Sequence, residues 1–378
     1  TLTFSVATPM AQTIFVNNDP KTQNKWSAAL AVVQAKKSYF EKKFIGDGDI
    51  AVIQRKTELE TSPGDRISFD LSVQLRGQAT EGDARLEGKE EQLRFFTDEV
   101  MIDQTRHAVS AGGHMTRKRT SINLRQTAKN RLSDYWSMFM DEMMFIYLSG
   151  ARGINPDFNF PISWAGRAGN PLQAPDAGHQ LYGGSATSKD TLTADDKMSR
   201  ELIERAEVKA TMLQAQDPES ANMVPVSIEG EDHYVTVMSP FQAHDLRMSE
   251  GGQGWLDIQK AAAGAEGRNN PIFKGGLGMI NNVVLHKHRN AIRFNDYGAG
   301  GDVHAGRALF MGRQAGVVAY GTSGGMRWSW KEKMKDYDNE PTVAAGSIFG
   351  FKKTRFNNQD FGVLSLDTAA ADPNAIAE

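Results

Sequence analysis

The stretch Ile67-Ser68-Phe69-Asp70-Leu71-Ser72-Val73-Gln74-Leu75 alternates strictly between apolar and polar side chains. Successive side chains of a β-strand point to opposite faces, so the alternation predicts a strand with one apolar face. A polar, glycine-containing segment follows at residues 77–92, and residues 93–102 return with aromatic and β-branched side chains. We therefore predict a long β-hairpin with arms of nine residues or more, about 30 Å at ~3.4 Å per residue.

The apolar face of this hairpin needs a covering surface, because an isolated two-stranded hairpin is only marginally stable in water. If the hairpin projects from its own domain, that surface must belong to a neighbouring chain. The sequence therefore predicts an inter-subunit contact through the apolar stripe, whose members are Ile67, Phe69, Leu71, Val73 and Leu75.

Two amphipathic helices flank the hairpin in the sequence. The first follows Asp19-Pro20 and carries apolar residues at helical spacing, namely Trp26, Leu30, Val33, Phe40 and Phe44. The second runs from Asn123 to Ser149, with Gly150 at the position of a C-cap. At ~1.5 Å per residue it is about 40 Å long, and a helix of this length typically forms a spine against which other elements pack.

The remainder of the chain consists of many short elements. Residues 151–192 are rich in Gly, Pro, Asn and Ser and predict a long loop. Helices are predicted to begin at the capping-box-like segment 193–196 and at Ser239-Pro240, the latter short and followed by another around Trp255. Strands are predicted at residues 224–228, 233–238, 282–286, 308–311, 317–320 and 361–366. Helices and strands are interspersed without a regular βαβ order, which indicates an α+β fold.

The composition excludes several classes of protein. The 378 residues are long enough for two or three lobes, and a net charge of −3 argues against a dedicated nucleic-acid binder. The chain has no cysteine, which excludes disulfides, a thiol nucleophile and Cys-ligated zinc. The longest apolar run, residues 143–148, is far shorter than the ~20 residues of a membrane span, so we expect no membrane partner.

Two patterns raise the alternative of a soluble hydrolase. Gly321-Thr322-Ser323-Gly324-Gly325 matches a nucleophile elbow, but no histidine follows His304, so a triad in the order Ser, acid, His is impossible. His286 and His288 would share one face of a strand, yet spacing alone supplies only two of the three or four ligands that a metal needs. We therefore predict a glycine-rich turn and packed or surface histidines, with no catalytic residue, no metal and no cofactor.

Charge is distributed unevenly in the first half of the chain. Residues 80–92, at the tip of the predicted hairpin, hold five acidic and two basic residues. The segment from Arg106 to Arg131 holds seven basic residues and no acidic one. This segment has three possible roles: a solvated face, a contact with the acidic tip of a neighbour, or a surface beside packed nucleic acid. For the contact role, the candidate residues are Arg117, Lys118 and Arg119.

Three blocks of sequence resemble the major capsid proteins of N4-like tailed phages. They are NPIFKGGLGMINNVVLHKH at residues 270–288, LFMGRQAGVVAYG at 309–321 and GSIFGFKKTRFNNQDFGVLSLDT at 346–368. The resemblance implies the HK97-like capsid fold with peripheral and axial domains. It assigns an N-terminal arm with an amphipathic helix to residues 1–50, an extended E-loop hairpin to 51–107, a peripheral domain with spine helix and loop insertion to 108–194, an axial domain to 195–330, and a return to the peripheral domain with a C-terminal tail to 331–378.

The same resemblance implies a structural protein rather than an enzyme. Copies would form pentamers and hexamers of the icosahedral head shell of a tailed double-stranded DNA phage, assembled in the host bacterial cytoplasm and present in the virion capsid. The implied partners are a portal protein, a possible decoration or cement protein, and packaged DNA on the inner face. Some shells of this fold form Lys-Asn crosslinks, but neither an asparagine partner for Lys89 nor a catalytic carboxylate is recognisable by motif, so we do not predict a crosslink. A cellular nanocompartment shell of the same fold is the related alternative.

Overall fold

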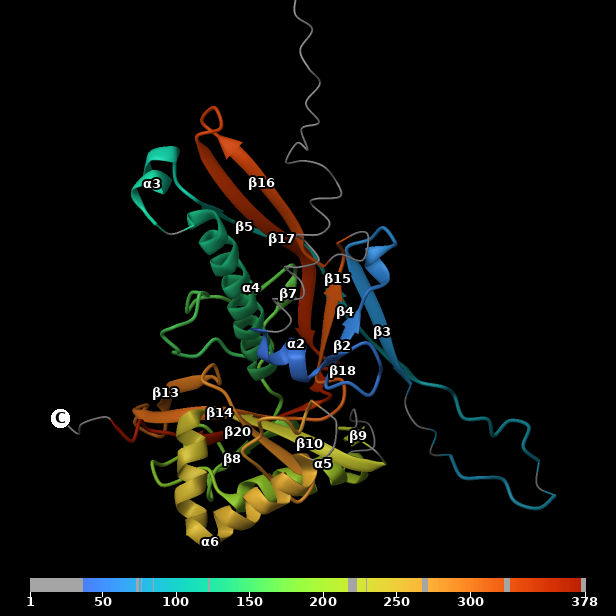
Figure 1. Cartoon of the computed structure of the whole chain (residues 1–378). Coiled ribbons are helices and arrows are strands. Elements are labelled where there is room, and N and C mark those ends of the chain that lie inside the picture. The colour runs from blue at the N-terminus through green and yellow to red at the C-terminus, as the bar shows by residue number, and fades with distance from the viewer. Residues whose placement is uncertain are drawn as a thin grey trace, which may run out of the picture.

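The computed structural model describes residues 37–72, 75, 77–83, 85–121, 123–216, 223–228, 230–266, 271–322 and 327–374. The predicted positions Trp26, Leu30, Val33, Val73 and Ser323 lie outside these residues. The described chain is built around two large β-sheets with helices packed against them (Figure 1).

The first sheet is organised around one long strand. Its strand order is β1-β2-β15-β17-β16, and β5 pairs with the other edge of β17. The bounds are β1 (Ile45–Gly46), β2 (Ile53–Lys56), β5 (Asp103–Ser110), β15 (Gly316–Tyr320), β16 (Ser329–Lys335) and β17 (Glu340–Lys353). Helix α4 (Leu124–Ser149) lies along one face of this sheet, where Trp136 contacts Trp328 at 4.7 Å between ring centroids.

The second sheet has the order β11-β12-β10-β14-β20-β8, with β13 beside β14 and β9 beside β10. The bounds are β8 (Gln180–Tyr182), β9 (Val226–Ile228), β10 (Glu231–Met238), β11 (Gly278–Ile280), β12 (Val283–Lys287), β13 (Arg293–Tyr297), β14 (Val303–Met311) and β20 (Val363–Ala369). Helices α5 (Arg200–Gln216) and α6 (Pro240–Glu266) pack on it through a core that includes Leu202, Leu246 and Phe310. The smaller elements are α2 (Tyr39–Lys43), α3 (His114–Arg119), the 3₁₀ turns Glu58–Glu60 and Ala177–His179, and the strand pairs β6 (Gly166–Arg167) with β7 (Asn170–Pro171) and β18 (Arg355–Phe356) with β19 (Gln359–Asp360).

The predicted hairpin is present, but its paired arms are shorter than expected. Strand β3 (Arg66–Ser72) pairs with β4 (Phe95–Met101) from Arg66 opposite Met101 to Ser72 opposite Phe95. Residues 77–83 and 85–94, called the hairpin loop below, contain no strand and extend away from both sheets (Figure 1). This loop is rich in glycine and charge, so it has little apolar surface with which to stabilise further pairing.

Three helix predictions need correction. Helix α2 begins at Tyr39, after Ser38, whose Oγ accepts the Glu41 backbone N–H and whose own backbone is extended, so the first predicted helix is not continuous to Phe44. Helix α5 begins at Arg200 rather than at residues 193–196, where the Asp196 carboxylate instead closes a turn by accepting the Thr193 backbone N–H at 2.7 Å. Helix α6 is one helix of 27 residues, not two short ones.

The sheets divide the chain differently from the predicted segment boundaries. Strand β15, predicted within residues 195–330, belongs to the first sheet, because it pairs with β17 along five residues. Strand β20, predicted within the return to the peripheral domain, belongs to the second sheet, where it pairs with β14 along seven residues. Strand β8, from within residues 108–194, also joins the second sheet.

Candidate functional site

The two histidines of the hydrolase alternative are part of the packed core. His286 is 1% exposed, and its Nε2–H donates to the Ile272 carbonyl at 2.8 Å. Burial, assisted by the charge of Lys43, lowers the pKa of His286 to about 4. The His288 ring stacks on Phe145 at 4.9 Å between centroids, and burial with the charges of Arg289 and Lys43 likewise lowers its pKa to about 4. Both rings are therefore neutral at pH 7 and packed against aromatic side chains.

The remaining catalytic and metal candidates do not assemble into a site within the described chain. His304 is exposed on β14, and Ser323 lies outside the described residues. Nowhere in the described ranges do three or more His, Asp or Glu side chains come together as a possible metal cluster. None of the helices described here is both long and apolar enough to cross a membrane.

Part of the basic segment is bound within its own chain. Arg125 forms an ion pair with Glu332 of β16 at 2.5 Å. Arg117, one of the three predicted contact residues, donates to the Asn339 carbonyl in the β16–β17 turn at 3.1 Å. Its guanidinium thus holds α3 to the end of the first sheet, which is a role inside the chain.

Other members of the basic segment are open to solvent. Lys118 and Arg119 are exposed at the end of α3, and Arg106 is exposed on β5. Since α3 is attached to the β16–β17 turn, Lys118 and Arg119 lie at the far end of the first sheet (Figure 1). Both remain available to a partner.

The apolar stripe of β3 is covered mostly by its own chain, contrary to the prediction that a neighbour covers it. Ile67 is 5% exposed and packs with Val317 of β15. Phe69 meets Phe356 edge-to-face at 6.0 Å, and Leu71 packs beside the same ring. Leu75 is 54% exposed, so of the described stripe residues it is the one left open to a partner.

The structure adds exposed apolar residues that the alternation did not reveal. Leu86, Leu93 and Phe95 are each more than half exposed, in or beside the hairpin loop. Each is an isolated apolar residue in a polar segment, so no helical or strand periodicity identifies it in the sequence. An exposed apolar residue in such a segment is nevertheless a weak sign of a contact with another chain.

The root of the hairpin is fixed to both the first sheet and α4. The buried Asp98 carboxylate of β4 accepts hydrogen bonds from the Lys352 ammonium and from the Arg355 backbone N–H. Asn170 bonds both the N–H and the carbonyl of Met101, at 3.0 and 2.8 Å, and its own carbonyl accepts the Tyr147 hydroxyl of α4 at 2.7 Å. These bonds set the direction in which the hairpin loop leaves the molecule.

The start of helix α2, at Ser38 and Tyr39, is held to α4 by a buried carboxylate. Asp141 accepts the Ser38 hydroxyl at 2.7 Å and the Tyr39 backbone N–H at 2.8 Å. Burial raises the pKa of Asp141 to about 6, although the bonds from Ser38 and Tyr39 oppose the shift. Phe40 and Phe44 are buried beside it, as the helical spacing predicted.

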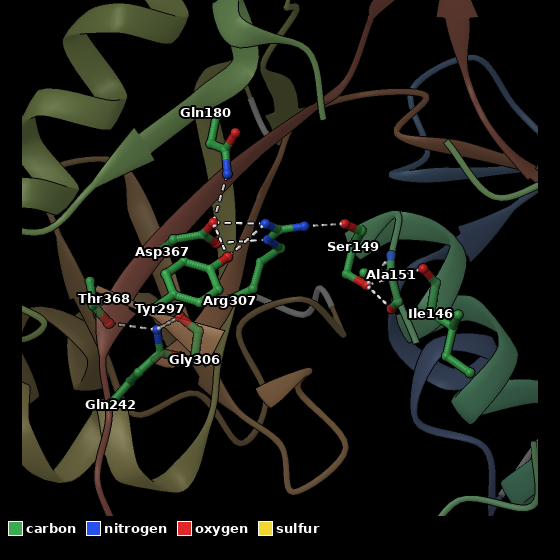
Figure 2. Close-up of polar contacts among 10 residues, drawn as sticks. All are labelled: Ile146, Ser149, Ala151, Gln180, Gln242, Tyr297, Gly306, Arg307, Asp367 and Thr368. Carbon is green, nitrogen blue, oxygen red and sulfur yellow. Dashed lines mark hydrogen bonds and ion pairs between the residues drawn. The ribbon is translucent and has the colours of Figure 1, made fainter. Parts of the chain in front are cut away.

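A buried ionic network joins the second sheet to the end of α4 (Figure 2). Arg307 of β14 binds both carboxylate oxygens of Asp367 on β20 at 2.7 Å and donates to the Ser149 carbonyl, also at 2.7 Å. The Tyr297 hydroxyl donates to Asp367 at 2.8 Å. Burial alone would lower the pKa of Arg307, but the Asp367 charge and the bonds in the network raise it, and burial with the Asp367 charge raises the pKa of Tyr297, so Arg307 stays charged and Tyr297 stays protonated at pH 7. The network therefore fixes the second sheet to the end of the long helix α4.

Comparison with known proteins identifies the family to which this fold belongs. The model of the family described as phage capsid protein matches residues 15–372. The chain belongs to the phage capsid protein family. A solved structure, the capsid of Ralstonia phage GP4, is 66% identical, covers 97% of this chain and 100% of that chain, and has a TM-score of 0.87.

More distant relatives agree. The major capsid protein of Pseudomonas phage KPP25 is 27% identical over 365 residues, which are 89% of this chain and 92% of that protein. The cyanophage Pam1 capsid asymmetric unit is 20% identical, with a TM-score of 0.67 over 98% of this chain and 100% of that one, and it supports the fold alone. The chain is thus a phage major capsid protein, a component of the virion that forms the head shell, and its mixed helix-and-sheet fold is the HK97-like one predicted from the sequence.

Proposed function

We propose that this capsid protein assembles with copies of itself into an icosahedral shell of pentamers and hexamers that encloses the double-stranded DNA of a tailed phage. The observation that carries the proposal is the 66% identity to the capsid of Ralstonia phage GP4 over 97% of the chain. The first sheet with α4 is the proposed peripheral domain, and the second sheet with α5 and α6 is the proposed axial domain.

The hairpin loop is the proposed E-loop, which interlocks neighbouring subunits. It extends away from its own chain and carries exposed apolar residues together with excess negative charge. Burial of Leu75, Leu86, Leu93 and Phe95 by a neighbour supplies apolar contact area, while the charges set orientation and register. Lys118 and Arg119, exposed at the far end of the first sheet, are proposed contact residues on the neighbouring subunit.

The other inferences concern partners and lineage. We infer a structural role without catalysis, since His286 and His288 are used as core residues. A portal protein, a possible decoration or cement protein and the packaged DNA are the proposed partners, and the host cytoplasm is the proposed place of assembly. The sequence blocks at 270–288, 309–321 and 346–368 support placement in the N4-like branch.

Electron microscopy of the purified protein, with and without phage DNA packaging, tests the proposal. We expect closed shells of uniform size, filled with DNA in particles from infected cells. Protein that remains monomeric at high concentration contradicts self-assembly. Shells that enclose protein cargo and never DNA favour a nanocompartment instead.

A further inference from the structure

Basic side chains gather around a hollow beside the start of α2. The hollow has a volume of about 350 Å³, and its lining includes Lys37, Arg131 of α4 and Arg289 in the loop after β12. Lys37 and Arg131 share the carboxylate of Asp134, whereas Arg289 is exposed and forms no ion pair in the described chain. The Asp141 carboxylate, which also lines the hollow, already accepts hydrogen bonds from the start of α2. The cations around the hollow therefore exceed the carboxylates that can neutralise them.

The positive charge continues from this hollow toward the second sheet. The Lys43 ammonium lies 5.0 Å from the centroid of the Tyr39 ring, which in turn contacts the His288 ring at 4.5 Å between centroids. A Cβ placed on Gly275 would lie 3.4 Å from the same ammonium, which brings the exposed Lys274 close to it. Together the cations form one surface, called the basic track below, whose members are Lys37, Lys42, Lys43, Arg131, Lys274 and Arg289.

The track is not neutralised by its own chain. Two of its members are paired with Asp134, and the other four form no ion pair among the described residues. Burial and the charge of Lys42 lower the pKa of Lys43, and burial with the charges of Arg289 and Lys43 lowers that of His288 to about 4. Positive charges thus face one another here without an anion between them. Negative charges bound from outside would relieve this repulsion.

The partner that fits the track best by charge is a nucleic acid. Residues 1–36, which lead into the track, hold three basic residues and one acidic one, so they add positive charge instead of cancelling it. The tip of the hairpin loop, at residues 80–92, carries charges of both signs. A DNA duplex presents one negative charge per ~1.7 Å of its axis and no positive one, and Lys and Arg are the side chains that bind phosphate. A row of unpaired cations from separate parts of the chain matches this pattern.

We propose that the basic track binds the phosphate backbone of the packaged double-stranded DNA, independently of its sequence, and therefore faces the inside of the shell. This inference rests on the proposed function and names the surface that contacts the genome. It moves the nucleic-acid role away from the segment between Arg106 and Arg131, of which Arg131 alone belongs to the track. The surface is instead assembled from α2, α4 and the loops before β11 and after β12.

Binding of a DNA duplex of about 30 base pairs to the unassembled chain tests the surface. The variant K274Q/R289Q should fold, because both side chains are exposed and unpaired, but should lower the affinity about tenfold at low salt. The slope of log affinity against log salt should fall by about 2, since each phosphate contact contributes ~0.9. The control K118Q/R119Q removes the same charge from α3 and should leave both quantities nearly unchanged. Unchanged binding by K274Q/R289Q, or an equal loss in the control, overturns the proposal.

Formaldehyde crosslinking of DNA-filled particles locates the contact in the shell. The reagent joins a lysine amine to a base amine through a methylene bridge, with loss of water. After nuclease digestion we expect nucleotide adducts on Lys42, Lys43 or Lys274, and none in particles emptied of DNA.

The other outcomes separate this inference from the proposed function. Filled particles whose adducts lie only on other segments overturn the inference and leave the proposed function standing. Particles that never contain DNA contradict the proposed function, and this inference with it. If K274Q/R289Q binds the duplex normally but fails to close shells, the track takes an acidic segment of a neighbouring copy instead, which also overturns the inference.

Discussion

Arg307 illustrates how a single buried charge holds large elements in place. Its guanidinium is bidentate to Asp367 and donates a further bond to the carbonyl end of α4, where the helix dipole favours a cation (Figure 2). Because both partners are fully desolvated, the pair itself contributes little net stability, yet loss of one member leaves an unpaired buried charge.

This reasoning predicts strong non-additivity. R307M and D367L should each lower the free energy of unfolding of the unassembled chain by ~3–5 kcal/mol, whereas R307M/D367L should cost clearly less than the sum. Denaturant unfolding of the four chains measures the coupling. K189A, which removes the exposed Lys189–Asp296 pair, is the control and should change stability by ~0–1 kcal/mol. Additive losses would mean that the two side chains do not act as a pair.

His286 gives the residue-scale prediction for pH. Its pKa is lowered from 6.5 to about 4, so between these values the unfolded chain takes up a proton that the folded chain does not. The contribution of His286 to stability is therefore complete above pH 6.5 and is lost as the pH falls toward 4. H286Q, which keeps a donor for the Ile272 carbonyl, should lose ~1–3 kcal/mol less than the parent between pH 7 and 4.5. Unfolding curves at both pH values check this, and equal losses in the two proteins would exclude the mechanism.

At the scale of elements, the sequence predicted the helices and strands in which apolar residues recur with the period of a helix or a strand. Strand β3 and helix α4 are of this kind, and α4 ends at Gly150 in the left-handed conformation, as its capping position predicted. Strand β17 was missed because apolar and polar residues do not alternate along its sequence. Close contacts with neighbouring strands determine its residue types instead. A Cβ at Gly350 would come within 1.9 Å of the Met101 carbonyl, and such close approaches leave glycines where a strand pattern expects side chains.

The charged surfaces of the molecule were predictable only in part, because some of them combine residues that are far apart in the sequence. The acidic tip is a local cluster and is visible in the sequence. The face of the first sheet that points away from α4 combines Arg106 with Lys331 and Lys333, which are more than two hundred residues apart in the sequence and share that face only through the register of β5 and β16 on β17. The glycines of α6 likewise interrupted the helical pattern, although the helix continues through them.

The hairpin loop gives the prediction at this scale. Deletion of residues 77–92 with a short glycine linker should leave a folded, soluble chain, because the root is fixed independently by Asp98 and Asn170. Shell closure should be lost, because the interlocking segment is missing. Circular dichroism and thermal unfolding report the fold, and electron microscopy reports shells. Intact particles from this variant would show that the loop does not interlock subunits.

At the scale of the whole molecule, a net charge of −3 conceals an acidic loop and a basic sheet face. Separated charges of this kind change little in the stability of one chain, but they determine how two chains meet. The absence of cysteine has the corresponding meaning for the shell: subunits of this chain are not joined to one another by disulfides.

These two properties together predict how assembly responds to solution conditions. Because the proposed contact is between exposed charges, raising ionic strength from ~0.05 to ~0.5 M shortens the Debye length from ~14 to ~4 Å and should slow shell formation markedly. A reducing agent should have no effect, since there is no thiol to reduce. Light scattering during assembly from subunits, at several salt concentrations and with or without dithiothreitol, measures both responses. Assembly that is indifferent to salt would mean that apolar burial alone drives the contact.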